Sequence, residues 1–124
     1  MAKLVLIVED SETCAETLLI ALESIPGLEP RVIHSPRAAI AAVWDKRNDI
    51  AAIVTDLHLP QSDGLDLIRQ VRAEPRFARL PIVLISGDSD PLLPARALAQ
   101  GADAFFPKPY SPAAVRKKLE QLLC

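Results

Sequence analysis

The stretch Ile-Ala-Ala-Ile-Val-Thr-Asp-Leu-His-Leu at residues 50–59 decides the fold of this chain, because an apolar run here ends in a single carboxylate. The run is rich in β-branched residues and is bounded by Asn48 and Asp49 before it and Pro60 after it. This pattern favours a strand buried on both faces, as in a parallel sheet. Asp56 is then expected at the C-terminal end of the strand, the edge where ligands bind in open α/β sheets.

Similar apolar runs recur along the chain and alternate with amphipathic segments. The other predicted strands lie at residues 3–8, 29–34, 80–86 and 104–107. Helices are predicted at about residues 13–25, 36–46, 65–74, 92–100 and 112–123. Strands separated by single helices imply right-handed crossovers and a parallel sheet covered on both faces. We therefore predict one α/β domain over residues 1–124, a flavodoxin-like doubly wound (βα)5 fold with strand order 2-1-3-4-5.

The helix boundaries rest on capping signals. Thr13 and Glu16 form a capping-box pattern that predicts the start of the first helix. Ser35 and Ser111 each precede a proline, which is typical of an N-cap followed by proline at the first helical position. The start of the helix at 92–100 is the least defined, because Pro94 must sit in its first turn or delay it.

Composition and charge narrow the class of protein. Half of the 124 residues are hydrophobic, which suffices for a core, and a net charge of −2 provides no basic surface for nucleic acid. The short apolar run at 3–8 ends in acids, which suits neither a signal peptide nor a membrane span. Cys14 and Cys124 match no metal or redox spacing. We expect a cytoplasmic protein with reduced thiols, no membrane segment and no direct nucleic-acid partner.

Polar residues follow the apolar runs at four strand ends. Glu9 and Asp10 follow the first strand, Asp56 ends the third, Ser86 ends the fourth and Lys108 follows the fifth. A parallel sheet brings these ends to one edge. Like-charged carboxylates about 4 Å apart repel by about 4 kcal/mol at an effective dielectric constant near 20, so a cation is required. Oxygen ligands with room for water and a phosphoryl oxygen suit Mg²⁺.

This combination of groups is suited to phosphoryl transfer. Asp56 can act as a nucleophile and form an aspartyl phosphate while the metal and Lys108 neutralise charge on the transferred group. Ser86 can donate its hydroxyl to a phosphoryl oxygen. Taken singly, each residue has a simpler explanation, such as a helix-end charge, a turn hydroxyl or a solvated lysine.

The set resembles the receiver domain of two-component response regulators, and the likeness covers essentially the entire chain. The residues that carry it are Glu9, Asp10, Asp56, Pro60, Asp63, Gly64, Ser86, Lys108 and Pro109. The resemblance implies that Asp56 is the phosphoacceptor and that Asp10 binds Mg²⁺ directly. It also implies that Glu9 acts through water or as a partner for Lys108.

Further roles follow from the same resemblance. The main-chain carbonyl of His58 would complete the protein ligands of the metal, and Ser86 and Phe105 would form a switch pair. The implied partner is a histidine kinase or a histidine phosphotransfer protein. The protein would catalyse its own phosphorylation and dephosphorylation, without being a classical enzyme, and would change the surface of its fourth helix, last strand and fifth helix. The downstream target, and whether phosphorylation drives formation of a homodimer, stay open.

Three departures from the family pattern bear on signalling rather than on chemistry. Ser62 replaces a frequent apolar residue, Phe105 lacks a tyrosine hydroxyl, and the segment 88–94 is rich in acid and proline. Two other functions compete with the switch. One is a receiver-like interaction module that is not phosphorylated. The other is a phosphatase of the haloacid dehalogenase type, whose second acid would fall at His58.

Overall fold

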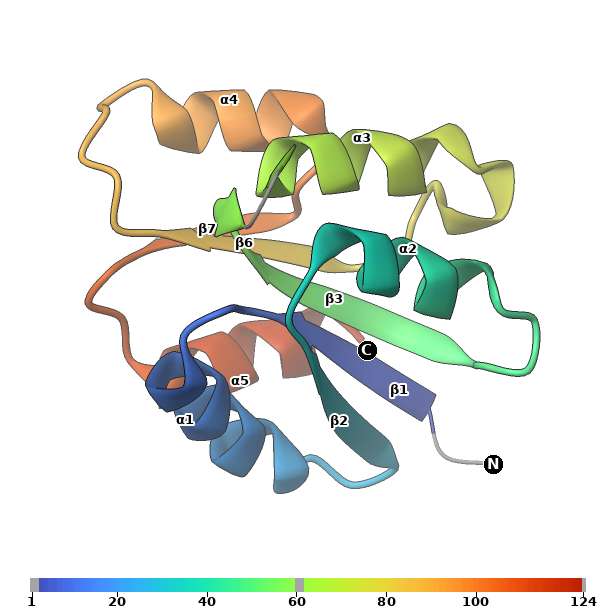
Figure 1. Cartoon of the computed structure of the whole chain (residues 1–124). Helices are drawn as coiled ribbons and strands as arrows, with labels where there is room; N and C mark the ends of the chain where they lie inside the picture. The colour runs from blue at the N-terminus through green and yellow to red at the C-terminus, as the bar shows by residue number, and fades with distance from the viewer. Residues whose placement is uncertain (1–2, 60–61, 124) are drawn as a thin grey trace.

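The chain folds around a parallel β-sheet with helices on both faces (Figure 1). The structure, a computed structural model, describes residues 3–59 and 62–123. Five strands form the sheet in the order β2-β1-β3-β6-β7. They are β1 (Lys3–Val8), β2 (Leu28–Ile33), β3 (Ile50–Asp56), β6 (Ile82–Ser86) and β7 (Ala104–Pro107). The order confirms the predicted flavodoxin-like topology, with β6 and β7 as the fourth and fifth strands.

In the part of the chain that the structure describes, five α-helices cover the sheet and one 3₁₀ helix, η1 (Pro75–Phe77), follows the third. The α-helices are α1 (Glu12–Glu23), α2 (Pro36–Trp44), α3 (Gly64–Ala73), α4 (Leu93–Gln100) and α5 (Pro112–Leu122). In Figure 1, α2, α3 and α4 lie on one face of the sheet and α1 and α5 on the other. Within the described ranges, no helix is long and apolar enough to cross a membrane.

Alternating side chains of the strands build two separate cores, one on each face. Leu6 and Val8 of β1 pack into the core under α2, α3 and α4, whereas Val5 and Ile7 pack into the core under α1 and α5. Because side chains alternate across a strand, a continuous apolar run is the sequence that buries both faces. Each fully buried aliphatic side chain contributes about 1.5–3 kcal/mol to this packing.

The first helix begins earlier than its capping-box pattern predicts. Ser11, rather than Thr13, is the N-cap, and its hydroxyl oxygen accepts from the Cys14 amide at 3.5 Å. The Ser11 amide in turn donates to Glu9 Oε1 at 3.0 Å. The carboxylate at the strand end therefore holds the turn after β1, and the N-cap lies two residues before Thr13, with the helix starting at Glu12. The other serine caps, Ser35 and Ser111, are confirmed.

The central strand also differs from its predicted extent of residues 50–59. It ends at Asp56, and β4 (His58–Leu59) instead pairs antiparallel with β5 (Ser62–Asp63) in a two-stranded sheet. The chain turns away from the main sheet where the Gly64 amide donates to the Leu57 carbonyl at 2.6 Å. Asp63 then caps α3 by accepting from the Asp66 amide. Pro60, predicted to close the strand, lies outside the described residues.

Candidate acidic site at the sheet edge

Three carboxylates meet at the C-terminal edge of β1 and β3. One oxygen each from Glu9, Asp10 and Asp56 lies within 4.8 Å of the other two. Glu9 is 1% exposed and Asp56 is 5% exposed, whereas Asp10 is exposed. The two strands are neighbours in the sheet, so residues far apart in sequence deliver their acids to one place. Clustering of these acids was predicted from the strand ends.

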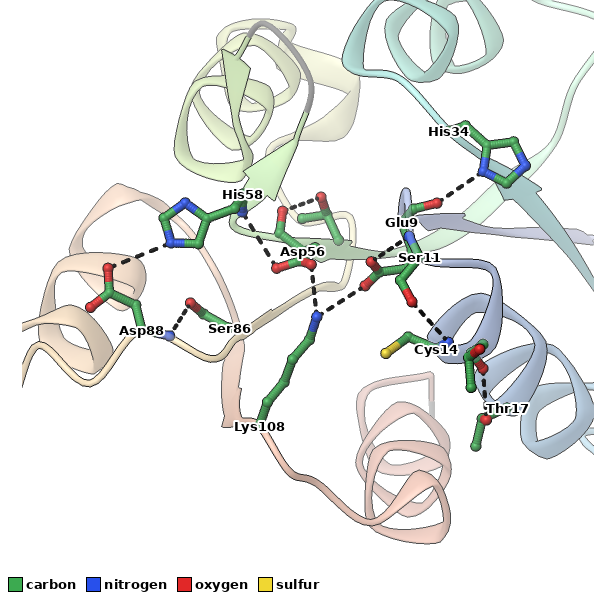
Figure 2. Close-up of polar contacts among 12 residues, drawn as sticks. Glu9, Ser11, Cys14, Thr17, His34, Asp56, His58, Ser86, Asp88 and Lys108 are labelled. Carbon is green, nitrogen blue, oxygen red and sulfur yellow. Dashed lines mark hydrogen bonds and ion pairs between the residues drawn. The ribbon is translucent and has the colours of Figure 1, made fainter.

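Lys108 supplies the positive charge of this site. Its Nζ lies 2.8 Å from Asp56 Oδ2 and 3.5 Å from Glu9 Oε2, and Figure 2 shows the side chain reaching between the two carboxylates. Burial by itself lowers the pKa of this lysine, but the hydrogen bond and charge of Asp56 outweigh it and raise the pKa to about 12. Lys108 is therefore a permanent cation at neutral pH.

Glu9 is held in a buried position by backbone contacts. Its Oε1 accepts from the Ser11 amide, and its carbonyl oxygen lies 3.0 Å from His34 Nδ1. Burial raises the pKa of Glu9 to about 7; the Ser11 hydrogen bond opposes this rise and the charge of Asp56 adds to it. Glu9 thus changes charge near neutral pH when no metal is bound.

Asp56 is positioned by the backbone around it. Its Oδ1 lies 3.4 Å from the His58 amide, which donates to it. Gly64 packs directly against the Asp56 main-chain carbonyl, and a Cβ atom at this position would overlap that oxygen and come within 2.9 Å of Leu84 Cδ1. The Asp-Gly pair at 63–64 therefore combines a helix cap with a residue small enough to lie behind the acid. The sequence singled out this pair, but it did not reveal why residue 64 must be a glycine.

Ser86 and Phe105 lie beside the site on neighbouring strands. Ser86 is fully buried, and its hydroxyl oxygen accepts from the Asp88 amide at 3.0 Å. Phe105 is half-buried and packs against the core under α2, α3 and α4. Phe105 pairs in register with Leu84, two residues before Ser86. The structure therefore places the two residues of the predicted switch pair on adjacent strands, two register positions apart.

Contacts of His58 and Asp88 were not anticipated from the sequence. The His58 side chain is 67% exposed, and its Nε2 lies 3.5 Å from Asp88 Oδ2. The pair spans from β4 to the loop after β6 (Figure 2). A residue of β4 and a residue of the loop after β6 share no periodic or spacing signal, so this contact could not be predicted from the sequence.

The donor set fits a hard divalent cation. Carboxylate oxygens converge from three residues, and oxygen ligands of this kind are those that Mg²⁺ prefers. Lys108 offsets part of the negative charge but leaves the cluster with an excess of acid. The arrangement can hold a cation next to a buried, lysine-paired aspartate.

The sequence also matches a known protein family. The family model of the response regulator receiver domain matches residues 5–120. The chain belongs to this family. Receiver domains are signalling switches of two-component systems, so the family places this chain in two-component signalling.

Relatives of this receiver domain include a chemotaxis protein and a DNA-binding response regulator. Chemotaxis protein CheY1 of Helicobacter pylori is 31% identical over 121 residues, which are 95% of this chain and 94% of the relative. The DNA-binding response regulator MtrA of Mycobacterium leprae is 33% identical, and the match covers 98% of this chain but 53% of MtrA. The receiver domain thus spans nearly all of the first relative and about half of the second.

Solved structures of other receiver domains superpose closely. The signal receiver domain of a signal transduction histidine kinase from Syntrophus aciditrophicus has a TM-score of 0.84 and 33% identity, over 98% of this chain and 90% of that one. Chemotaxis response regulator CheY4 of Vibrio cholerae has a TM-score of 0.85 at 24% identity, over 99% of this chain and 100% of that one. The second likeness supports the receiver domain's fold.

Proposed function

We propose that this receiver domain is a phosphorylation-activated switch in which Asp56 accepts a phosphoryl group in a Mg²⁺-dependent reaction. The observation that supports this most directly is the contact of the Asp56 carboxylate with Lys108 at 2.8 Å inside a cluster of acids. A buried carboxylate that faces a fixed cation on one side and a metal-binding set on the other has the surroundings of an activated nucleophile.

The transfer itself is a displacement at phosphorus. An Asp56 carboxylate oxygen forms a bond to phosphorus, and the bond from phosphorus to the leaving group of the donor breaks and takes its electron pair. With an acyl phosphate the leaving group is a carboxylate, and with a phosphohistidine it is an imidazole that then takes up a proton. Apart from the bond that Asp56 forms, the protein assists the transfer by positioning the reacting groups and by neutralising charge.

Different residues of the chain would position the reacting groups and neutralise their charge. Lys108 holds the Asp56 carboxylate in place and can move its ammonium to an oxygen of the phosphoryl group. Ser86 would donate its hydroxyl to another oxygen, and Phe105 would repack at β7. Asp10 and Asp56, together with the main-chain carbonyl of His58, would hold Mg²⁺, and Glu9 would act through water. When bound, the metal supplies positive charge next to the phosphoryl oxygens.

The partners follow from the same chemistry. The phosphoryl donor we propose is a histidine kinase or a histidine phosphotransfer protein, the class that supplies receiver domains. The charge gained at Asp56 would then alter the surface formed by α4, β7 and α5, where a downstream target binds. A coupling of about 1–3 kcal/mol between the site and that surface suffices for regulation.

The test is incubation with acetyl phosphate and Mg²⁺, followed by intact-mass measurement. We expect the mass of one phosphoryl group to be added to the native protein and not to the Asp56→Asn variant, and we expect chelation of the metal to abolish the addition. Asp49→Asn is the matched control, because this exposed aspartate precedes β3 at the opposite end of the strand. No mass gain, or an equal gain in Asp56→Asn, would refute the proposal.

A further inference from the structure

Asp88 lies in the loop between β6 and α4 and makes three polar contacts. Its amide donates to the Ser86 hydroxyl oxygen at 3.0 Å, and its Oδ1 accepts from the Asp90 amide at 2.9 Å. Its Oδ2 lies 3.5 Å from His58 Nε2. In Figure 2 the His58 ring reaches Asp88 from the β4 side, while the Ser86 hydroxyl points toward the Asp88 backbone nitrogen.

The contact with Asp88 fixes the direction of the Ser86 hydroxyl. Ser86 is fully buried, so its Oγ relies on protein partners, and the Asp88 amide donates to it. Side-chain oxygens move between separate staggered positions rather than continuously. A rotation that turns Oγ toward a group on Asp56 therefore takes it away from the Asp88 amide. The two arrangements of Ser86 exclude one another.

The Asp88 backbone cannot simply follow the hydroxyl, because its side chain is held from two directions. His58, in β4, contacts the carboxylate from one direction. Asp90 holds it from the loop, and Asp90 itself accepts from the Leu92 amide at 2.9 Å, next to the start of α4. The acid- and proline-rich segment 88–94 thus takes part in a continuous series of hydrogen bonds. The series begins at Ser86 and ends at Leu92, at the N-terminal end of α4.

We propose that Asp88 is a positioning residue that holds the Ser86 hydroxyl away from Asp56 in the unmodified protein, and that His58 fixes Asp88 in this arrangement. The inference rests on the proposed function, because it concerns the hydroxyl that would bind the phosphoryl group. It predicts that removing the contacts of the Asp88 side chain lowers the free energy needed to rotate the Ser86 hydroxyl toward Asp56. Any ligand that needs the turned hydroxyl then binds more tightly, since less of its binding free energy is spent on the rearrangement.

The experiment measures the affinity for beryllofluoride, a phosphoryl mimic, in the presence of Mg²⁺. We compare the native chain with Asp88→Ala, His58→Ala and the double variant by calorimetric titration at constant pH. Because the two side chains are 38% and 67% exposed, we expect each single variant to bind about two- to fivefold more tightly. The double variant is expected to bind no more tightly than Asp88→Ala, because both changes break the same contact.

Asp45→Ala is the matched control. Asp45 also accepts from the amide two residues later, that of Arg47 at 3.0 Å, and it also forms an ion pair, with the Arg47 side chain. It lies at the C-terminal end of α2, away from the Ser86 end of the sheet. We expect this variant to bind beryllofluoride as the native chain does.

Hydrogen exchange of the Asp88 amide provides a readout that does not depend on affinity. We expect slow exchange in the unmodified native chain, and fast exchange both in Ser86→Ala and in the native chain with Mg²⁺ and beryllofluoride. An amide that stays protected with the mimic bound would overturn the inference.

The remaining outcomes separate the two proposals. Tighter binding in Asp88→Ala but not in His58→Ala would show that only the loss of a negative charge matters, and would overturn the inference. Native binding with unchanged variants would overturn the inference and leave the proposed function standing. If the native chain neither binds beryllofluoride nor gains mass with acetyl phosphate, both fail together.

Discussion

Nζ of Lys108 lies 2.8 Å from Oδ2 of Asp56, although 52 residues separate them in sequence. The contact joins the ends of β3 and β7, which are not neighbours in the sheet. It brings a cation to a carboxylate that is 5% exposed, and the same ammonium also lies 3.5 Å from Glu9. Charges that are largely removed from water depend on such partners.

Replacement of Lys108 by methionine is expected to destabilise the metal-free protein by about 1–3 kcal/mol at pH 8, because two buried carboxylates lose their cation. Urea unfolding measures the change. Added Mg²⁺ should restore part of the stability, since a cation again faces the acids. Lys117→Met, at an exposed position of α5, is the control and should change the stability by less than about 0.5 kcal/mol. Equal effects of the two substitutions would contradict the role assigned to the Lys108 contacts.

Glu9 makes stability depend on pH near neutrality. Burial raises its pKa from 4.5 to about 7, so between these values the folded protein binds more protons than the unfolded chain. The stability that this group contributes is present below pH 4.5 and is lost as pH rises through about 7. We expect Glu9→Gln to match the native chain at pH 5 and to exceed it by about 1–3 kcal/mol at pH 8 without metal. Thermal or urea unfolding at both values tests this, and a gain that is equal at both would exclude Glu9 titration as its cause.

Gly64 is expected to be intolerant of any side chain. In Gly64→Ala the added Cβ overlaps the Asp56 carbonyl oxygen and crowds Leu84, so the backbone that carries the acid must shift. We expect a loss of about 1–3 kcal/mol in stability and weaker Mg²⁺ binding. Gly87→Ala is the matched control near the same site, because its added Cβ would meet Lys108 at an ordinary 3.7 Å. Comparable losses in both variants would argue against the overlap.

Arg72 connects α3 to the segments around the start of β7. Its guanidinium donates to the carbonyls of Gly101 and Phe77 and to Asp103 Oδ2, which also accepts from the Ile82 amide. The C-terminal end of α4 is thereby attached to the body of the domain. Arg72→Lys cannot form this fork of bonds, and we expect a loss of about 1–3 kcal/mol.

Arg69 is the control for this substitution on the same helix. It is exposed and pairs with Asp66, so Arg69→Lys should change the stability by less than about 0.5 kcal/mol. Urea unfolding of both variants provides the comparison. A loss in Arg69→Lys as large as that in Arg72→Lys would contradict the assignment.

Local patterns in the chain account for the fold and for the clustering of acids. Continuous apolar runs such as 3–8 can be buried on both faces only as inner parallel strands, and the observed strand order agrees with that prediction. Since parallel strands end at one edge, residues after those runs had to converge. Glu9, Asp10 and Asp56 were placed together on that ground alone, and the structure confirms their proximity.

Boundaries and contacts between loops depended on tertiary structure. Ser11 rather than Thr13 caps α1 because the Glu9 carboxylate binds the Ser11 amide. The central strand ends at Asp56 because Gly64 turns the chain back against it. The sequence by itself determined which chemical groups gather at the sheet edge, through the period and order of its strands. Only the folded chain decided that Lys108 contacts Asp56 and that Asp88 contacts both Ser86 and His58. Such contacts join segments that share no local periodicity. They are therefore specified by how these segments pack against one another in the folded chain.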